Sequence, residues 1–262
     1  MPSGILAALC LAASVGTLAV QAQPFRALEQ RLTPEYEGLV RTLRTFYSGA
    51  SLRFNARGEP VSVGAPVPWT LGARIAVANL RVRPGKLEIG GTRLFLAYDH
   101  RQKELQPWVT TMNLRVDIAL ELKTSDESAV RSALNKIFLA RDEKIEDVLP
   151  SYWRSFFTGQ APRRAQKAYR VKDGVSPPRL VARAHPEYSQ FAREAGLQGT
   201  VVLWAVVNEQ GETEDLRIVK PLGLGLDEAA IEAVRQWKFE PGRREGSPVP
   251  VATSIDVTFR KL

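Results

Sequence analysis

The sequence predicts an α+β protein of two domains: an N-terminal α+β domain with antiparallel strands, then a smaller domain with a three-stranded antiparallel sheet and two helices. The length of 262 residues suits two domains better than one small one. Both halves combine strand-like alternation with helix-like spacing. Residues 159–178 are basic and lack a clear apolar period. We therefore expect domains at residues 24–158 and 179–262, joined by a linker at 159–178.

The start of the chain predicts export. Residues 4–20 carry no charge and are mostly Ala, Leu and Val, which suits the core of a signal peptide. Val20-Gln21-Ala22 is a small-x-small cleavage pattern, so we expect residues 1–22 to be removed. No Lys or Arg precedes the apolar run, so an uncleaved inner-membrane anchor is the alternative. Both interpretations place the rest of the chain in the periplasm.

Cysteine content and charge narrow the function classes. Cys10 is the only cysteine and lies in the apolar run, so the mature chain has no disulfide, zinc-finger or thiol chemistry. Residues 171–262 hold 12 basic and 13 acidic residues, which leaves 36 − 12 = 24 basic and 28 − 13 = 15 acidic residues elsewhere. A basic face fits nucleic acid, but export argues against that partner. Anionic envelope surfaces or a simple solvated face are the alternatives.

The first domain is expected to open with a helix. Thr33-Pro34-Glu35 is typical of a helix start, and apolar residues follow at helical spacing until Gly49. The capping box Thr124-Ser125-Asp126-Glu127 predicts another helix, and a shorter helical piece is expected from Lys144 to Phe157. The second helix has an apolar stripe formed by Val130, Ala133, Leu134, Ile137 and Phe138.

Strands are expected between these helices. The predicted strands are Ile75–Val82, Arg93–Tyr98 and Met112–Glu121, the last with clear alternation. Turn signals lie at Asn55–Gly58 and Arg83–Lys86, and Gly90-Gly91 is a candidate tight hairpin turn.

The second domain has a clear order of elements. A short helix is expected at Pro186–Ala195, strands at Thr200–Val207 and Thr213–Lys220, and a second helix capped by Asp227. A last strand then alternates up to Phe259. Because a helix crosses between the second and last strands, the last strand should pair with the first. The expected order is second–first–last, all antiparallel, with the last strand at an edge.

Residues 179–262 resemble the TonB C-terminal domain family through an ordered series of short matches. The matching stretches are Pro186-Glu187-Tyr188 with Ala192-Arg193, Gly196–Val201, Asn208-Glu209-Gln210-Gly211, Leu226–Ala230, Trp237–Pro241, Gly246–Val249 and Val257-Thr258-Phe259. The resemblance implies a small antiparallel sheet with two helices on one face. It also implies relatives that couple the inner-membrane proton gradient to outer-membrane receptors with ExbB and ExbD. Such relatives capture a short receptor segment, the Ton box, by strand addition.

The chain departs from the family pattern in three places. Tyr188-Ser189 stands where the family has Tyr-Pro. A folded domain replaces the long Pro-rich spacer, and the apolar run lacks a basic flank and a Ser-x₃-His pattern. The last two departures argue against energy coupling and against ExbB/ExbD-like partners.

No residue pattern predicts catalysis, a cofactor or a metal site, so we expect no enzyme. His100 and His185 are isolated, and the acidic group Glu209, Glu212, Glu214 and Asp215 lacks calcium-loop spacing. Gly223-Leu224-Gly225 is interpreted as the entry to a helix instead of a phosphate loop. Core packing is the expected role of Trp237 and Phe239, and also of Trp108, Trp153, Phe156 and Phe157, for which a binding surface is the alternative.

The predicted function is binding of envelope proteins by edge-strand addition, in the context of outer-membrane transport. The expected partner is an outer-membrane receptor or other envelope protein that supplies an extended peptide; a homodimer through the same edge is the alternative, and nucleic acid is not expected. A sensor or scaffold without energy coupling, or an enzyme sited in residues 24–158, are the other hypotheses. The predicted partner-binding residues are Val249, Val251, Ala252, Thr253, Ser254, Ile255, Asp256, Val257, Thr258 and Phe259.

Overall fold

The structure is a computed structural model and describes residues 9–63, 66–67, 70–99, 101–102, 104–107, 114–159, 168–171 and 174–260. It confirms the α+β class. The chain groups into two compact units. Unit 1 comprises residues 1–67, 73–93 and 114–142, and unit 2 comprises residues 68–72, 94–113 and 143–262. Residues 68–72, 94–113 and 143–158 thus group with the C-terminal part, while a boundary near residue 159 between independently folding domains stays a prediction.

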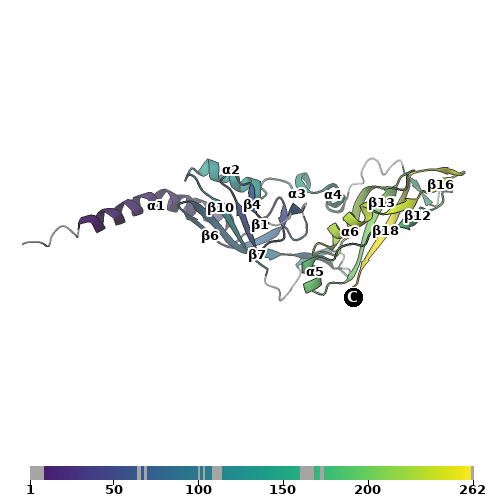
Figure 1. The fold of residues 1–262 in the computed structure, drawn as a ribbon, viewed down its shortest axis with the longest axis horizontal. Helices are drawn as coiled ribbons and strands as arrows, with labels where there is room; N and C mark the ends of the chain where they lie inside the picture. Colours follow the sequence, from purple (N-terminus) through teal and green to yellow (C-terminus); the bar gives the residue numbers. More distant parts are fainter. Residues whose placement is uncertain are drawn as a thin grey trace, which may run out of the picture. The chain divides into compact units, whose positions relative to one another are not determined.

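Unit 1 is built on a six-stranded sheet with the order β1-β6-β7-β10-β3-β4 (Figure 1). Its strands are β1 (Val40–Thr42), β3 (Ser51–Phe54), β4 (Pro60–Ser62), β6 (Arg74–Arg83), β7 (Lys86–Leu94) and β10 (Arg115–Glu121). A separate short pair joins β2 (Phe46–Tyr47) and β5 (Pro66–Val67). β10 runs antiparallel to β7 and parallel to β3, and its side chains alternate between buried and exposed as predicted.

Two helices belong to unit 1, α1 (Leu9–Tyr36) and α2 (Glu127–Ile137). The apolar stripe predicted on α2 is buried. Its N-cap is Asp126 instead of Thr124: the Asp126 carboxylate accepts the Ser128 N–H at 3.0 Å. Among the described residues, no helix is both long and apolar enough to span a membrane.

The helix predicted from Thr33 to Gly49 is wrong. Pro34 lies in the last turn of α1, not the first turn of a new helix, and α1 ends at Tyr36. Gly38 then has φ +73°, which ends the helical path, and its N–H donates to Val77. The apolar residues that follow lie on short strands instead of a helix, because β1 forms its hydrogen bonds with β6. Spacing alone did not reveal this tertiary pairing.

The hairpin turn predicted at Gly90-Gly91 is also wrong. Both glycines lie within β7, opposite Asp117 and Val116 of β10. A Cβ atom on Gly91 would lie 2.5 Å from the carbonyl oxygen of Ala76, so glycine is required by the close approach of the chain, not by a turn. Met112, at the start of another predicted strand, lies outside the described residues.

Unit 2 contains a four-stranded sheet with the order β11-β18-β13-β14. Figure 1 labels two of its strands, β13 and β18. These strands are β11 (Tyr169–Arg170), β13 (Gly199–Val207), β14 (Thr213–Lys220) and β18 (Val251–Phe259). β13 is central, and β14 and β18 are antiparallel to it, which confirms the predicted three-strand order. β11 was not predicted and runs parallel to β18.

Short strand pairs and helices complete the described part of unit 2. The pairs are β8 (Leu96–Asp99) with β9 (Glu104–Pro107), β12 (Arg179–Ala182) with β15 (Lys238–Glu240), and β16 (Arg243–Arg244) with β17 (Ser247–Pro248). The helices are α3 (Ile145–Val148), α4 (Ser151–Thr158), α5 (Gln190–Glu194) and α6 (Leu226–Arg235).

The ends of α5 and α6 differ from the prediction. Ser189 caps α5 by accepting the Ala192 N–H at 3.0 Å, which explains how serine serves where the family has proline. α6 begins after Gly225, so Asp227 is not its cap. The Asp227 carboxylate instead accepts the N–H groups of Leu222 and Gly223, at 2.7 and 2.9 Å, and so holds the loop before the helix.

Candidate partner-binding site

The outer edge of β18 is defined by the direction of its backbone groups. The Tyr169 N–H of β11 donates to the Pro250 carbonyl at 2.9 Å, so Pro250 faces this edge. Backbone groups of alternate residues point to the same side of a strand, and the register with β13 is unbroken from Val251 to Phe259. The N–H and C=O groups of Ala252, Ser254, Asp256 and Thr258 therefore also face outward.

Side chains alternate along β18 in the same rhythm. Val251, Ile255, Val257 and Phe259 are buried, and they anchor the strand to the core of unit 2. Ser254, Asp256 and Thr258 are exposed on the opposite face, so the residues with outward backbone groups also carry the polar side chains. The Phe259 ring packs edge-on against Tyr188, with ring centroids 5.7 Å apart.

Only the beginning of this edge is covered by a described strand. β11 pairs with Val251 and Ala252, and no described strand pairs with the outer edge of Thr253–Phe259. Val249 precedes β18 and donates its N–H to the Gly242 carbonyl, so this N–H is already used in a hydrogen bond within unit 2. Of the ten predicted residues, nine thus lie on one strand, and their role in partner binding stays a prediction.

A tight hairpin places the start of β18. β16 and β17 are joined by Glu245 and Gly246, which both have positive φ, +52° and +83°, as a hairpin turn with matching twist requires. The guanidinium of Arg244 lies 5.2 Å from the ring centre of Tyr169. The sequence missed both Tyr169 and Arg244, and an aromatic residue within the basic linker was the one available signal.

None of the described residues singled out for other chemistry forms a metal or catalytic group. His185 is exposed, and His100 lies outside the described residues, as does Trp108. Glu212 pairs with Lys238 at 2.8 Å and Glu214 accepts from Asn208 at 3.0 Å, both at the β13–β14 hairpin. Within the described part of the chain, no group of three His, Cys, Asp or Glu side chains is arranged to hold a metal ion.

The aromatic residues of α4 join the core of unit 2. Trp153 is fully buried and contacts the rings of Phe156 and Phe157. Trp237 is buried as well, and its indole N–H donates to Ala184 at 2.8 Å. Trp153 and Trp237 thus have the core role expected of them, whereas Phe156, Phe157 and Phe239 are only half-buried.

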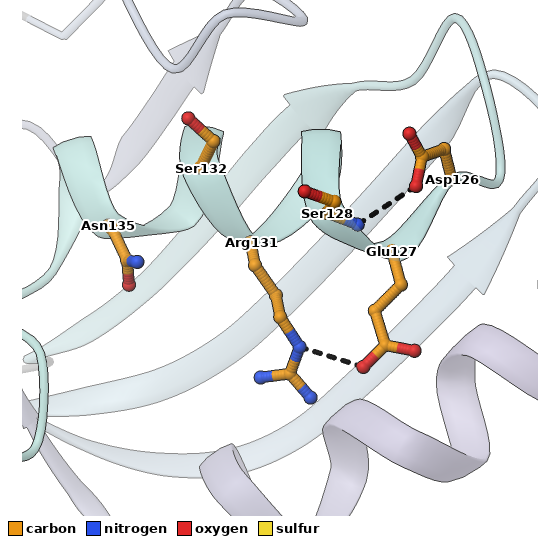
Figure 2. A pocket seen from close by; sticks show the side chains of 6 residues that line it. All are labelled: Asp126, Glu127, Ser128, Arg131, Ser132 and Asn135. Atoms are coloured by element: carbon orange, nitrogen blue, oxygen red, sulfur yellow. Dashed lines mark hydrogen bonds and ion pairs between the residues drawn. The ribbon is translucent and has the colours of Figure 1, made fainter.

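A surface depression of about 700 Å³ lies on α2 in unit 1. Figure 2 shows its lining, Asp126, Glu127, Ser128, Arg131, Ser132 and Asn135. Its guanidinium is already engaged: Arg131 pairs with Glu35 of α1 at 2.6 Å and with Glu127 at 2.8 Å. The Arg131 guanidinium is therefore already paired with carboxylates of the chain, and its pair with Glu35 joins α2 to α1.

Together, the central β13, the crossover helix α6 and the strand β18 define unit 2 as carrying a small α+β domain. Among the described residues, no strand pairs with the outer edge of β18 after Ala252. Residues 184–260 match the family described as Gram-negative bacterial TonB protein C-terminal. This match confirms the predicted resemblance of the C-terminal part of the chain to the TonB C-terminal domain family.

The chain is also similar, over part of its length, to curated proteins. The chain is 35% identical over 88 residues to Protein TonB of Vibrio cholerae, covering 33% of this chain and 36% of that protein. It is 33% identical over 76 residues to Protein tonB2 of Pseudomonas aeruginosa, covering 29% and 28%. A solution NMR structure of the Pseudomonas aeruginosa TonB CTD matches 36% of this chain and 96% of that chain, at 20% identity and a TM-score of 0.28. The chain thus spans about a third of the length of these curated relatives.

Proposed function

We propose that the chain is an exported, non-enzymatic envelope protein whose TonB C-terminal domain binds an extended peptide of another envelope protein. The peptide adds as a strand to β18 between Thr253 and Phe259. The observation that carries the proposal is the row of outward backbone groups at Ser254, Asp256 and Thr258, beyond which no described strand lies. An outer-membrane receptor is the proposed source of the peptide, and outer-membrane transport the proposed process.

Backbone pairing alone gives weak affinity. Three outward residues offer three N–H and three C=O groups, and each hydrogen bond contributes about 0.5–1.5 kcal/mol net. The sum, about 3–9 kcal/mol, is of the order of the association cost of about 4–15 kcal/mol. Exposed side chains next to the edge must therefore add affinity and select the partner.

The other hypotheses have less support. An enzyme or sensor in residues 24–158 would need a site with uncommitted polar groups, whereas the charged groups of the α2 depression pair with one another. A homodimer through the β18 edge would use the same backbone groups and is therefore an outcome of the test below. Periplasmic localisation, by a cleaved signal or an anchor at residues 4–20, is part of the proposal.

Position-specific cross-linking in living cells tests the proposal. A photoreactive amino acid replaces Asp256 beside the edge, and a matched variant carries it at Glu209, which is exposed on the β13–β14 turn. We expect cross-links from position 256 to an extended segment of an outer-membrane protein, and none to that segment from position 209. Equal cross-linking from both positions, or cross-links from position 256 only to a second copy of the chain, would contradict the proposed partner.

A further inference from the structure

The edge of β18 already carries one added strand, which comes from the chain itself. β11 pairs in parallel with Val251 and Ala252, and the Tyr169 N–H donates to the Pro250 carbonyl at 2.9 Å. It is the only described strand on this side of β18. The outward groups of Pro250 and Ala252 are thus used internally, while those of Ser254, Asp256 and Thr258 are not paired with any described strand.

Two features hold β11 at this place. The Arg244 guanidinium of the β16–β17 hairpin lies 5.2 Å from the Tyr169 ring centre, which is cation–π distance. β11 is also covalently joined to the domain that it pairs with, so its effective concentration at the edge is far above that of a free peptide. A two-residue strand, too short to bind well as a separate molecule, can therefore stay paired.

We infer that β11 is an intramolecular strand that closes the first part of the β18 edge and so fixes where a partner strand begins. The inference rests on the proposed function and specifies its register. Two strands cannot occupy the same backbone groups, so a partner peptide is confined to Thr253–Phe259 while β11 is in place. A longer peptide gains no further pairing unless it displaces Tyr169 and Arg170.

Two proline variants of the full chain separate this role from a general effect on the linker. The Tyr169 backbone faces β18, so Tyr169→Pro removes the N–H that bonds to Pro250. The Arg170 N–H faces away from β18, so Arg170→Pro leaves the ladder intact and is the matched control. Tyr169→Ala, which removes the ring over Arg244 but keeps the N–H, provides a milder second variant.

The first readout needs no ligand. Amide hydrogen exchange is followed by NMR for Ala252, whose outward N–H lies opposite β11. We expect exchange at Ala252 to accelerate at least about tenfold in Tyr169→Pro, less in Tyr169→Ala, and not in Arg170→Pro. Unchanged protection of Ala252 in a folded Tyr169→Pro protein would overturn the inference.

The second readout uses a probe peptide of about ten residues, selected from a random displayed library for binding to the full wild-type chain. A version cut to about seven residues matches the length of Thr253–Phe259. We expect the long and short probes to bind wild type and Arg170→Pro alike, and the long probe to bind Tyr169→Pro at least about fivefold more tightly than the short one. If the ratio of long-probe to short-probe affinity is the same in wild type, Arg170→Pro and Tyr169→Pro, β11 does not fix where a partner strand begins. If Ser254→Pro leaves probe binding unchanged, the proposed function is contradicted. The hydrogen exchange of Ala252 needs no ligand and still tests whether β11 covers the edge.

Discussion

The indole Nε1–H of Trp153 on α4 donates to Oε1 of Glu228 on α6 at 2.9 Å. The other carboxyl oxygen, Oε2, is buried and has no hydrogen-bond partner among the described residues. Burial and, second to it, the neighbouring Asp227 carboxylate raise the pKa of Glu228 to about 8, against the opposing effect of the hydrogen bond from Trp153. Burial also raises the pKa of Asp227 to about 6, against the opposing effect of the two N–H groups that it accepts. The hydrogen bond between Trp153 and Glu228 therefore joins α4 to α6 through a carboxyl group that is neutral near pH 7.

The first prediction is that the free energy of unfolding falls as the pH rises from about 4.5 to about 8. Unfolded, Glu228 ionises near 4.5; folded, near 8, so between these values the folded state binds more protons. Its contribution is fully present below pH 4.5 and lost as pH rises through about 8, with a slope of up to about 1.4 kcal/mol per pH unit. Urea unfolding at a series of pH values measures it.

The matched variant is Glu228→Gln, which keeps an acceptor for Trp153 and removes the titration. We expect its free energy of unfolding to change less with pH than that of wild type, with the shallower remainder due to Asp227. Equal slopes for the two proteins would show that Glu228 is ionised throughout.

The second prediction concerns Gly211, in the turn between β13 and β14. Its φ is +76°, and an added Cβ would lie 1.8 Å from the Phe239 carbonyl oxygen. Gly196 has a similar φ of +62° but open space around its Cβ position. Gly196→Ala should cost about 1–2 kcal/mol from backbone strain alone, and Gly211→Ala at least about 2 kcal/mol more, since the clash adds to it. Thermal or urea unfolding compares them, and equal costs would refute the steric account.

The third prediction concerns the two ion pairs of Arg131, one of which joins α2 to α1 and the other of which lies within α2. Arg131 reaches both Glu35 and Glu127, and Figure 2 shows its guanidinium directed toward Glu127. Since these side chains are about one-third exposed, Arg131→Met should cost only about 0.5–2 kcal/mol, and less at high salt. Lys136→Met, at an exposed position of the same helix, is the control. A loss that is equal in both variants, or independent of salt, would argue against the pairs.

Regular, well-buried elements could be predicted from the sequence. The apolar run of β13 and the alternation of β18 each fix one face against a core, and the order of the strands followed from the helix between them. The stripe on α2 was predicted for the same reason. In each case the local pattern and the tertiary burial agree, so the pattern alone is sufficient.

Elements set by distant partners could not be predicted. The residues after Gly38 have helical spacing, but β1 is stabilised by pairing with β6. Gly90 and Gly91 look like a turn because the close contact with Ala76 is not visible in the sequence. Within the site, β18 was predicted and β11 was not, because two residues show no period and their partner lies far along the chain.

Binding of the probe peptide to Ser254→Pro tests the central claim most directly. The Ser254 N–H faces outward, so proline removes one donor for an added strand while the pairing of β18 with β13 is kept; Ser254→Ala controls for the hydroxyl group. With circular dichroism unchanged, calorimetry should show at least about tenfold weaker binding to Ser254→Pro, equivalent to about 1.4 kcal/mol, and near wild-type binding to Ser254→Ala. Full affinity in a folded Ser254→Pro protein would contradict strand addition at this edge.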